Sequence, residues 1–252
     1  SSLLGPEISN NKPLAILIDI IAILTTVFGV TTSLGLGTVQ ISSGLAHVFS
    51  INETFSNQVI IIAVITLIGL ISVCLGLDTG IKKLSQVNMV LATTLMAFIF
   101  IFGPTVFILN ALIQNFGSYV NTLIESATWT EVYQSTSWQN GWTLFFYTWW
   151  FAWAPFVSLF IARISYGRSI KEFIIGVLFV PSLIVFLWMG IFGNAAIYQV
   201  INETSQINEI VNNNYTVALF ALFDVYPIPK IASIFSLILI VTFFVTSSDS
   251  GA

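Results

Sequence analysis

The fold of this chain is decided by residues 142–171, WTLFFYTWWFAWAPFVSLFIARISYGRSIK. Its first part, Trp142 to Ala162, is about 21 residues long and carries no charge, and about 20 apolar residues are enough for a helix to cross the ~30 Å hydrocarbon core of a bilayer. Arg163, Arg168 and Lys171 follow, and basic residues beside a span normally stay on the cytoplasmic side. The stretch therefore predicts a transmembrane helix with a cytoplasmic C-terminal end.

Aromatic side chains are concentrated near the middle of this predicted span. Trp149, Trp150 and Trp153 lie there, although Trp normally collects at the membrane interface. On a helix, Trp149, Trp153 and Phe156 share one face, whereas Tyr147 and Trp150 share an adjacent one. Aromatic faces at this depth can solvate a cation that has no N–H to donate, such as a quaternary ammonium. The alternative is that the rings only pack helices together.

The composition of the whole chain is that of an integral membrane protein. Of its 252 residues, 56% are hydrophobic and 7% are charged, whereas a soluble domain carries about 25% charged residues. The net charge of −4 argues against a nucleic-acid partner. A single cysteine and a single histidine indicate neither a disulfide framework nor a zinc site, and we find no acid–base or metal-ligand cluster that would indicate an enzyme.

Hydropathy predicts an all-α polytopic protein with about six membrane-spanning helices and one interfacial helix. The expected spans are residues 13–36, 58–77, 87–113, 142–162, 173–192 and 231 onward. Residues 115–140 predict a helix in the membrane interface, residues 194–214 a polar loop, and residues 215–225 a re-entrant or surface helix too short to span. We expect Gly35 and Gly37 to permit either a close helix contact or a break, and Gly103-Pro104 to kink the third span.

Basic residues are distributed unequally between the two sides of this predicted topology. With both ends of the chain cytoplasmic, the residues that fall inside are Lys12, Lys82, Lys83, Arg163, Arg168 and Lys171, and only Lys230 falls outside. This asymmetry predicts the orientation. Because the sequence begins without Met and stops within a helix-compatible run, we expect it to be an internal piece of a longer protein.

Several segments resemble the betaine/choline/carnitine transporter family. They are residues 149–168 (WWFAWAPFVSLFIARISYGR), residues 32–45 (TSLGLGTVQISSGL), residues 243–251 (FFVTSSDSG) and the stretch from Pro6 onward. The resemblance implies spans five to ten of a twelve-span transporter whose LeuT-like core consists of two inverted five-helix repeats. Residues 13–113 would end the first repeat, residues 142–252 would begin the second, and residues 115–140 would lie between them. The resemblance also implies a homotrimer in the inner (plasma) membrane.

The same resemblance implies a substrate site and a function. Trp150 matches a residue of the family's aromatic substrate box, Trp149 and Trp153 match aromatics along the pathway, and Tyr147 stands where close relatives carry Trp. The implied function is secondary transport of a quaternary ammonium or other onium solute, such as glycine betaine, choline or carnitine, by sodium-coupled symport. Proton coupling and ion-independent exchange remain alternatives within the family. A channel or a structural membrane subunit is the alternative of another class, although a channel should show polar or charged pore-lining rings.

Sodium is the coupling ion that the resemblance implies, and no other cofactor is expected. Thr246, Ser247 and the carbonyl of Phe243 match the ligands of one ion. Phe156 and Thr26 match part of a second site, in which Val30 stands in the place of a second threonine. Hydroxyls and backbone carbonyls suit a hard cation. The alternative is that Thr246 and Ser247 bond to carbonyls of their own helix or join helices together.

Overall fold

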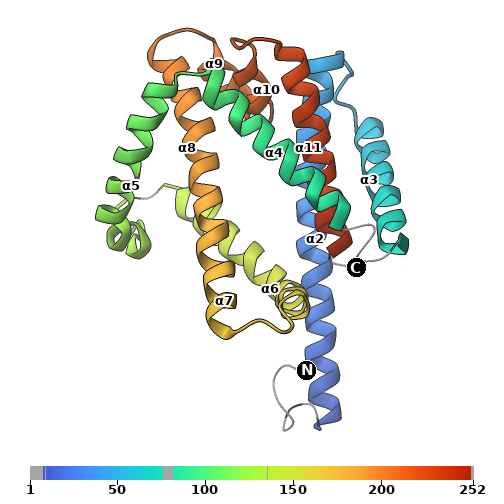
Figure 1. Cartoon of the computed structure of the whole chain (residues 1–252). Helices are drawn as coiled ribbons and strands as arrows, with labels where there is room; N and C mark the ends of the chain where they lie inside the picture. Colours follow the sequence, from blue (N-terminus) through green and yellow to red (C-terminus); the bar gives the residue numbers. More distant parts are fainter. Residues whose placement is uncertain (1–7, 9, 76–81, 135, 251–252) are drawn as a thin grey trace. The chain divides into compact units, whose positions relative to one another are not determined.

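The computed structural model of this chain describes residue 8 and residues 10–75, 82–134 and 136–250, and every regular element within these ranges is a helix. Figure 1 shows these helices along the chain. The chain divides into two compact units. The first unit contains the described residues up to Gly35 together with residues 130–167. The second contains residues 36–129 and 168–249.

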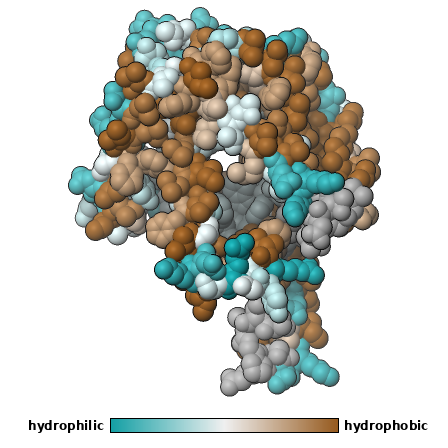
Figure 2. All heavy atoms as spheres, in the orientation of Figure 1, coloured by the Kyte–Doolittle hydropathy of each residue, from teal (hydrophilic) through white to brown (hydrophobic). Residues whose placement is uncertain are grey.

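Six helices of the described residues are long and apolar enough to cross a membrane, which confirms the expected number. They are Lys12–Phe49, Phe55–Cys74, Lys82–Phe102, Gln139–Ile164, Ile170–Ile201 and Pro229–Ser248. These helices hide few of their own side chains within the chain: the buried share of the most apolar window is 0% for Gln139–Ile164 and reaches 44% only for Pro229–Ser248. Figure 2 shows the resulting apolar surface along the long helices, with hydrophilic residues at the top of the view and in a second group in its lower half. Such a surface suits a lipid environment.

The first span, α2 (Lys12–Phe49), is one uninterrupted helix of 38 residues, so the expected end at Leu36 and the alternative of a break are wrong. Hydroxyl side chains in its first part bond back to the helix, as Ser33 Oγ does to the carbonyl of Gly29 at 3.1 Å. Gly37 serves close packing instead, whereas a Cβ atom added at Gly35 would meet nothing within 4 Å. A Cβ atom at Gly37 would lie 2.3 Å from the ring of Phe244 on α11 (Pro229–Ser250), so the expected close contact is confirmed there.

The second and third expected spans differ in their bounds from the observed helices. Helix α3 is Phe55–Leu75, and the expected end at Leu77 lies outside the described residues. The third span is divided into α4 (Lys82–Phe102) and α5 (Thr105–Thr128), so the expected kink is a complete break. Thr105 Oγ1 donates to the carbonyl of Phe100 at 2.6 Å and occupies an acceptor that the end of α4 leaves open.

The interfacial helix expected at residues 115–140 begins earlier and ends earlier than the sequence indicated. It is α5, which starts at Thr105 directly after Pro104 and ends at Thr128, because proline suits the start of a helix but not its interior. The boundary expected between the first repeat and the following segment, at residues 113–115, therefore lies inside one helix. Whether α5 lies in the interface stays a prediction.

The fourth span begins in a π-helical turn, and the fifth contains one. Helix α6 (Phe145–Ile164) follows the π turn Gln139–Leu144. Helix α7 (Ile170–Ile174) begins at a capping box between Ser169 and Glu172 and continues through the π turn Ile175–Phe179 into α8 (Val180–Ile201). The polar loop expected from residue 194 is therefore wrong over its first part, and a further helix, α9 (Ile207–Asn213), follows. Asn194 stays helical because its amide donates to the carbonyl of Gly190 at 2.7 Å.

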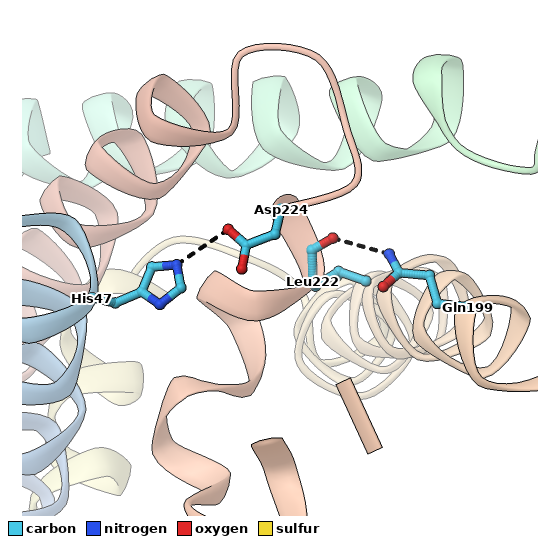
Figure 3. Close-up of polar contacts among 4 residues, drawn as sticks. All are labelled: His47, Gln199, Leu222 and Asp224. Carbon is cyan, nitrogen blue, oxygen red and sulfur yellow. Dashed lines mark hydrogen bonds and ion pairs between the residues drawn. The ribbon is translucent and has the colours of Figure 1, made fainter. Parts of the chain in front are cut away.

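The segment expected to be a re-entrant or surface helix is a short buried one. Helix α10 (Ala218–Phe223) follows the 3₁₀ turn Tyr215–Val217, and its residues 220–223 are all buried, so a surface position is wrong. Two polar contacts hold it (Figure 3): Gln199 Nε2 on α8 donates to the carbonyl of Leu222 at 3.0 Å, and His47 Nε2 on α2 lies 3.2 Å from Asp224 Oδ1. The core of the second unit forms around α10, with residues from α4, α5, α8, α9 and α11.

Candidate functional site

The tryptophan-rich stretch is helical throughout, despite an internal proline. Helix α6 contains Pro155, which has no N–H for the carbonyl four residues earlier and usually kinks a helix. Ser158 Oγ donates to the carbonyl of Pro155 at 3.0 Å. The predicted helical spacing of the aromatic residues therefore holds along the whole stretch.

One face of α6 packs against the first part of α2, within the first unit. Trp149 Nε1 donates to Ser33 Oγ at 3.2 Å. Four residues later, the indole of Trp153 lies over Gly29, where an added Cβ atom would come within 2.6 Å of Trp153 Cδ1. These two pairs run in opposite directions along the chain, so α2 and α6 pack antiparallel. The shared face expected for Trp149 and Trp153 is confirmed.

Two of the predicted substrate residues belong to a different face of α6. The side chains of Trp150 and Tyr147 are 70% and 63% exposed, as is that of their neighbour Phe151 at 72%. Trp149 and Trp153 are half-buried by comparison. Within the described chain, α6 therefore presents one anchored aromatic face and one accessible aromatic face.

The indole N–H of Trp153 is buried and has no hydrogen-bond partner among the described residues. Leaving such a donor unpaired costs about 1–3 kcal/mol. The ring itself is well fixed, since its centroid lies 5.0 Å from that of Phe156. The site therefore holds an oriented N–H donor beside aromatic faces, covered by α2 at Gly29.

The residues expected for the second sodium site lie opposite each other on α2 and α6. The register set by Trp149–Ser33 and Trp153–Gly29 places Phe156 opposite Thr26. Thr26 Oγ1 donates to the carbonyl of Ala22 at 2.8 Å, so this hydroxyl is bonded to its own helix. Val30, one turn further along, adds no oxygen.

The residues expected for the first sodium site lie near the end of α11, in the second unit. Thr246 Oγ1 donates to the carbonyls of Phe243 and Thr242, at 2.9 Å and 3.1 Å. The same oxygen accepts a hydrogen bond from Asn88 Nδ2 on α4 at 3.2 Å. Ser247 is half-buried beside it. Thr246 thus makes both of the contacts that a hydroxyl in a membrane helix commonly makes, a bond to its own helix and a bond to a neighbouring helix.

Comparison with known proteins decides which family these features belong to. A model of the betaine/carnitine/choline family transporters (BCCT) matches residues 1–252. The chain belongs to this family. BCCT proteins are membrane transporters, not enzymes.

Relatives of this BCCT chain are similar over nearly its whole length. It is 42% identical over 241 residues to the glycine betaine transporter of Acinetobacter baylyi, which covers 95% of this chain and 36% of that protein. It is 45% identical over 236 residues to the glycine betaine/proline/choline transporter of Vibrio parahaemolyticus, with 94% and 42% covered. It is 42% identical over 253 residues to the glycine betaine transporter OpuD of Bacillus subtilis, with 100% and 48% covered. The chain therefore spans less than half the length of these curated relatives.

Three residues that contact the candidate site residues of this BCCT chain were not identified from sequence. Gly29 contacts Trp153 and Ser33 contacts Trp149, and these two residues are one turn apart on α2. Asn88 contacts Thr246 and is seven and eleven residues before Leu95 and Ile99 on the buried face of α4. A polar residue in phase with a buried apolar face is the signal that could have identified Asn88.

Proposed function

We propose that the complete protein containing this chain is a secondary active transporter for quaternary ammonium or related onium solutes, with glycine betaine, choline and carnitine as the candidate substrates. The observation that carries this proposal is the double-faced aromatic helix α6. Trp149 and Trp153 are anchored on α2, while Trp150 and Tyr147 stay accessible. The names of the relatives, which are glycine betaine and choline transporters, support the same substrate class.

In this proposal the two ends of the substrate are recognised by different groups. The methylated ammonium has no N–H, so its attraction to the protein is to the faces of aromatic rings, of which Trp150 offers the most strongly attracting type. The opposite end of betaine, choline or carnitine carries an oxygen acceptor. The indole N–H of Trp153 is buried against α2 and has no partner among the described residues, so it can donate to that oxygen only when the indole moves away from Gly29.

Sodium coupling is the second part of the proposal. Thr246, Ser247 and the carbonyl of Phe243 offer neutral oxygen atoms near the end of α11, and Thr246 Oγ1 and the Phe243 carbonyl are already 2.9 Å apart. Such a donor set fits a hard monovalent cation and lacks the fixed charge that would hold the ion too tightly for release. Thr26 and Phe156 offer a weaker second site, because Val30 supplies no ligand. The ion would add the driving force of its own gradient.

The setting of this transporter is also proposed. The asymmetry of the basic residues supports a topology in which both ends of the chain lie on the cytoplasmic side of the plasma (inner) membrane. The inverted repeats and the homotrimer rest on the family resemblance. The lipid bilayer and a small onium solute are the partners, and no nucleic acid is involved.

The experiment is uptake of radiolabelled glycine betaine, choline, carnitine and proline by cells that express the complete transporter and lack their own. We expect Trp150→Ala to weaken apparent substrate affinity by roughly 2- to 30-fold, because one cation–π contact is worth about 0.5–2 kcal/mol. Trp150→Phe should retain part of the affinity. The matched control is Phe151→Ala, which removes a neighbouring ring of equal exposure. Equal losses in both alanine variants would assign Trp150 to packing.

The same assay tests the coupling ion. Uptake should rise with external sodium and should respond less to it in Thr246→Ala/Ser247→Ala. Full uptake in sodium-free buffer would reject sodium coupling in favour of proton coupling or exchange, which a pH gradient or preloaded substrate then separates. Passive flux that never concentrates the substrate would indicate a channel instead.

A further inference from the structure

Asn88 carries a half-satisfied polar group inside the second unit. The residue is 2% exposed and lies on the face of α4 that packs within this unit. Its amide nitrogen donates to Thr246 Oγ1 on α11 at 3.2 Å. Its amide oxygen is buried and has no hydrogen-bond partner among the described residues.

A buried carbonyl oxygen without a partner is unusual. Folded proteins pair the large majority of such atoms, and an exception commonly marks a bound water, an ion or a functional group. An aspartate here would add a charge, and an aliphatic residue of similar size would remove the unpaired oxygen. This position thus holds a neutral oxygen that the described residues do not use, beside a hydroxyl proposed above as an ion ligand.

We propose that Asn88 supplies its side-chain oxygen as a ligand to the ion held by Thr246 and Ser247. This inference rests on the sodium coupling proposed above. The oxygen and nitrogen of a carboxamide are about 2.2 Å apart, so Asn88 Oδ1 lies within about 5.5 Å of Thr246 Oγ1. Sodium is close to calcium in ionic radius, and two oxygens on opposite sides of a calcium ion are about 5 Å apart. The separation of the two oxygens is thus close to that of two ligands on opposite sides of one ion.

This arrangement gives α4 a direct part in ion binding. Three oxygens from two helices then surround the same point: Asn88 Oδ1, Thr246 Oγ1 and the carbonyl of Phe243, which is itself 2.9 Å from Thr246 Oγ1. Carboxamide oxygens are ordinary ligands of hard cations. Because Asn88 is neutral, it adds affinity without adding a charge that would have to be buried when the ion leaves.

The test measures ion binding directly, through thermal unfolding of the purified complete transporter in detergent. Sodium chloride is titrated against potassium chloride at constant ionic strength, without substrate. A ligand that binds only the folded state raises the unfolding temperature with its concentration. We expect wild type to show a sodium-specific rise, and Asn88→Leu to need at least about tenfold more sodium for half of that rise.

Two further variants separate an ion ligand from a residue that only bonds to Thr246. Asn88→Asp keeps a side-chain oxygen but removes the N–H donor, so a ligand role predicts a sodium response as strong as in wild type or stronger. A role confined to the Thr246 hydrogen bond predicts the weakened response of Asn88→Leu. Asn194→Leu is the matched control, because Asn194 is also buried, on α8, with its amide bonded to Gly190 and Asn115. It should keep the wild-type sodium curve.

Uptake kinetics supply an independent readout. In Asn88→Leu the sodium concentration for half-maximal uptake should rise by a similar factor, while the KM for betaine at saturating sodium stays unchanged. The inference is overturned if wild type responds to sodium and Asn88→Leu responds identically, or if Asn88→Asp behaves as Asn88→Leu. A wild-type protein that does not respond to sodium at all overturns the coupling proposal itself and this inference with it.

Discussion

At the scale of single residues, a glycine sets the depth at which Trp153 lies. An added Cβ atom at Gly29 would meet Trp153 Cδ1 at 2.6 Å and Trp153 Nε1 at 2.9 Å, distances well inside van der Waals contact. The indole can therefore approach the backbone of α2 only because no side chain intervenes. Ser33, one turn along α2, fixes the neighbouring Trp149 through its hydroxyl. The anchored aromatic face of α6 depends on these two small residues.

We predict that Gly29→Ala displaces Trp153 and impairs transport. Overpacking a close contact costs about 1–3 kcal/mol, which exceeds the roughly 1 kcal/mol that alanine gains over glycine in a helix. Thermal unfolding should show a lower midpoint, and betaine uptake should show a higher KM. The control is Gly35→Ala on the same helix, where the added Cβ would meet nothing within 4 Å and stability should rise slightly. If both variants behave alike, the close contact does not matter.

At this scale the sequence predicts one part of the site and misses another. The two faces of α6 follow from helical spacing alone, because Trp149 and Trp153 are four residues apart in one regular element. The partners Gly29 and Asn88 belong to distant segments, and a period within one helix carries no information about which residue of another helix lies opposite. A hydroxyl such as that of Thr246 can serve as an ion ligand or can bond to helices. Its bonds to its own helix and to α4 are the contacts that the structure shows.

At the scale of elements, the short helix α10 organises the core of the second unit. Its residues Phe220 and Phe223 are fully buried, and Gln199 uses both ends of its amide nearby, donating to Leu222 and accepting from Ser205 Oγ at 2.8 Å. A hydrophobic run too short to span a membrane has therefore become an internal packing element, held by α8 on one side and by α2 on the other.

We predict that Phe223→Ala strongly destabilises the protein. Truncating a fully buried phenylalanine typically costs about 3–5 kcal/mol, since it leaves a cavity that the surroundings refill only in part. Thermal unfolding in detergent measures the effect. Phe55→Ala, at the start of α3 where the ring is 80% exposed, should change the midpoint little. A comparable loss in the two variants would contradict the central packing role of α10.

The elements also show where sequence patterns stop being informative. The number of spans and the centres of most of them follow from runs of apolar residues, whereas their ends do not. Polar residues such as Asn194 continue α8 because their side chains bond inside the fold, so polarity alone gave a premature end. Gly35 and Gly37 are equally compatible with a close helix contact and with a helix break. The position of the Phe244 ring beside Gly37 decides in favour of the contact. Only at Gly103-Pro104 did the local signal coincide with a break.

At the scale of the whole molecule, the distribution of charge predicts the orientation in the membrane. The prediction can be tested in a Cys74→Ser background, which removes the single cysteine. Glu209→Cys on α9 should react with a membrane-impermeant thiol reagent in intact cells. Lys171→Cys at the start of α7 should react only after permeabilisation, because basic residues are retained on the cytoplasmic side. Both side chains are exposed, so access to the thiol does not limit the reaction. The reverse pattern would invert the topology.

The contacts between the end of α2 and α10 have a mechanical consequence. Within about one turn of α2, Ser43 Oγ accepts from Thr216 Oγ1 at 2.6 Å, Gly44 admits the ring of Phe220, to which a Cβ atom would come within 2.3 Å, and His47 lies 3.2 Å from Asp224. A rotation of α2 relative to α10 would break all three contacts together. A displacement of the C-terminal end of α2 must therefore either carry α10 with it or break these three contacts.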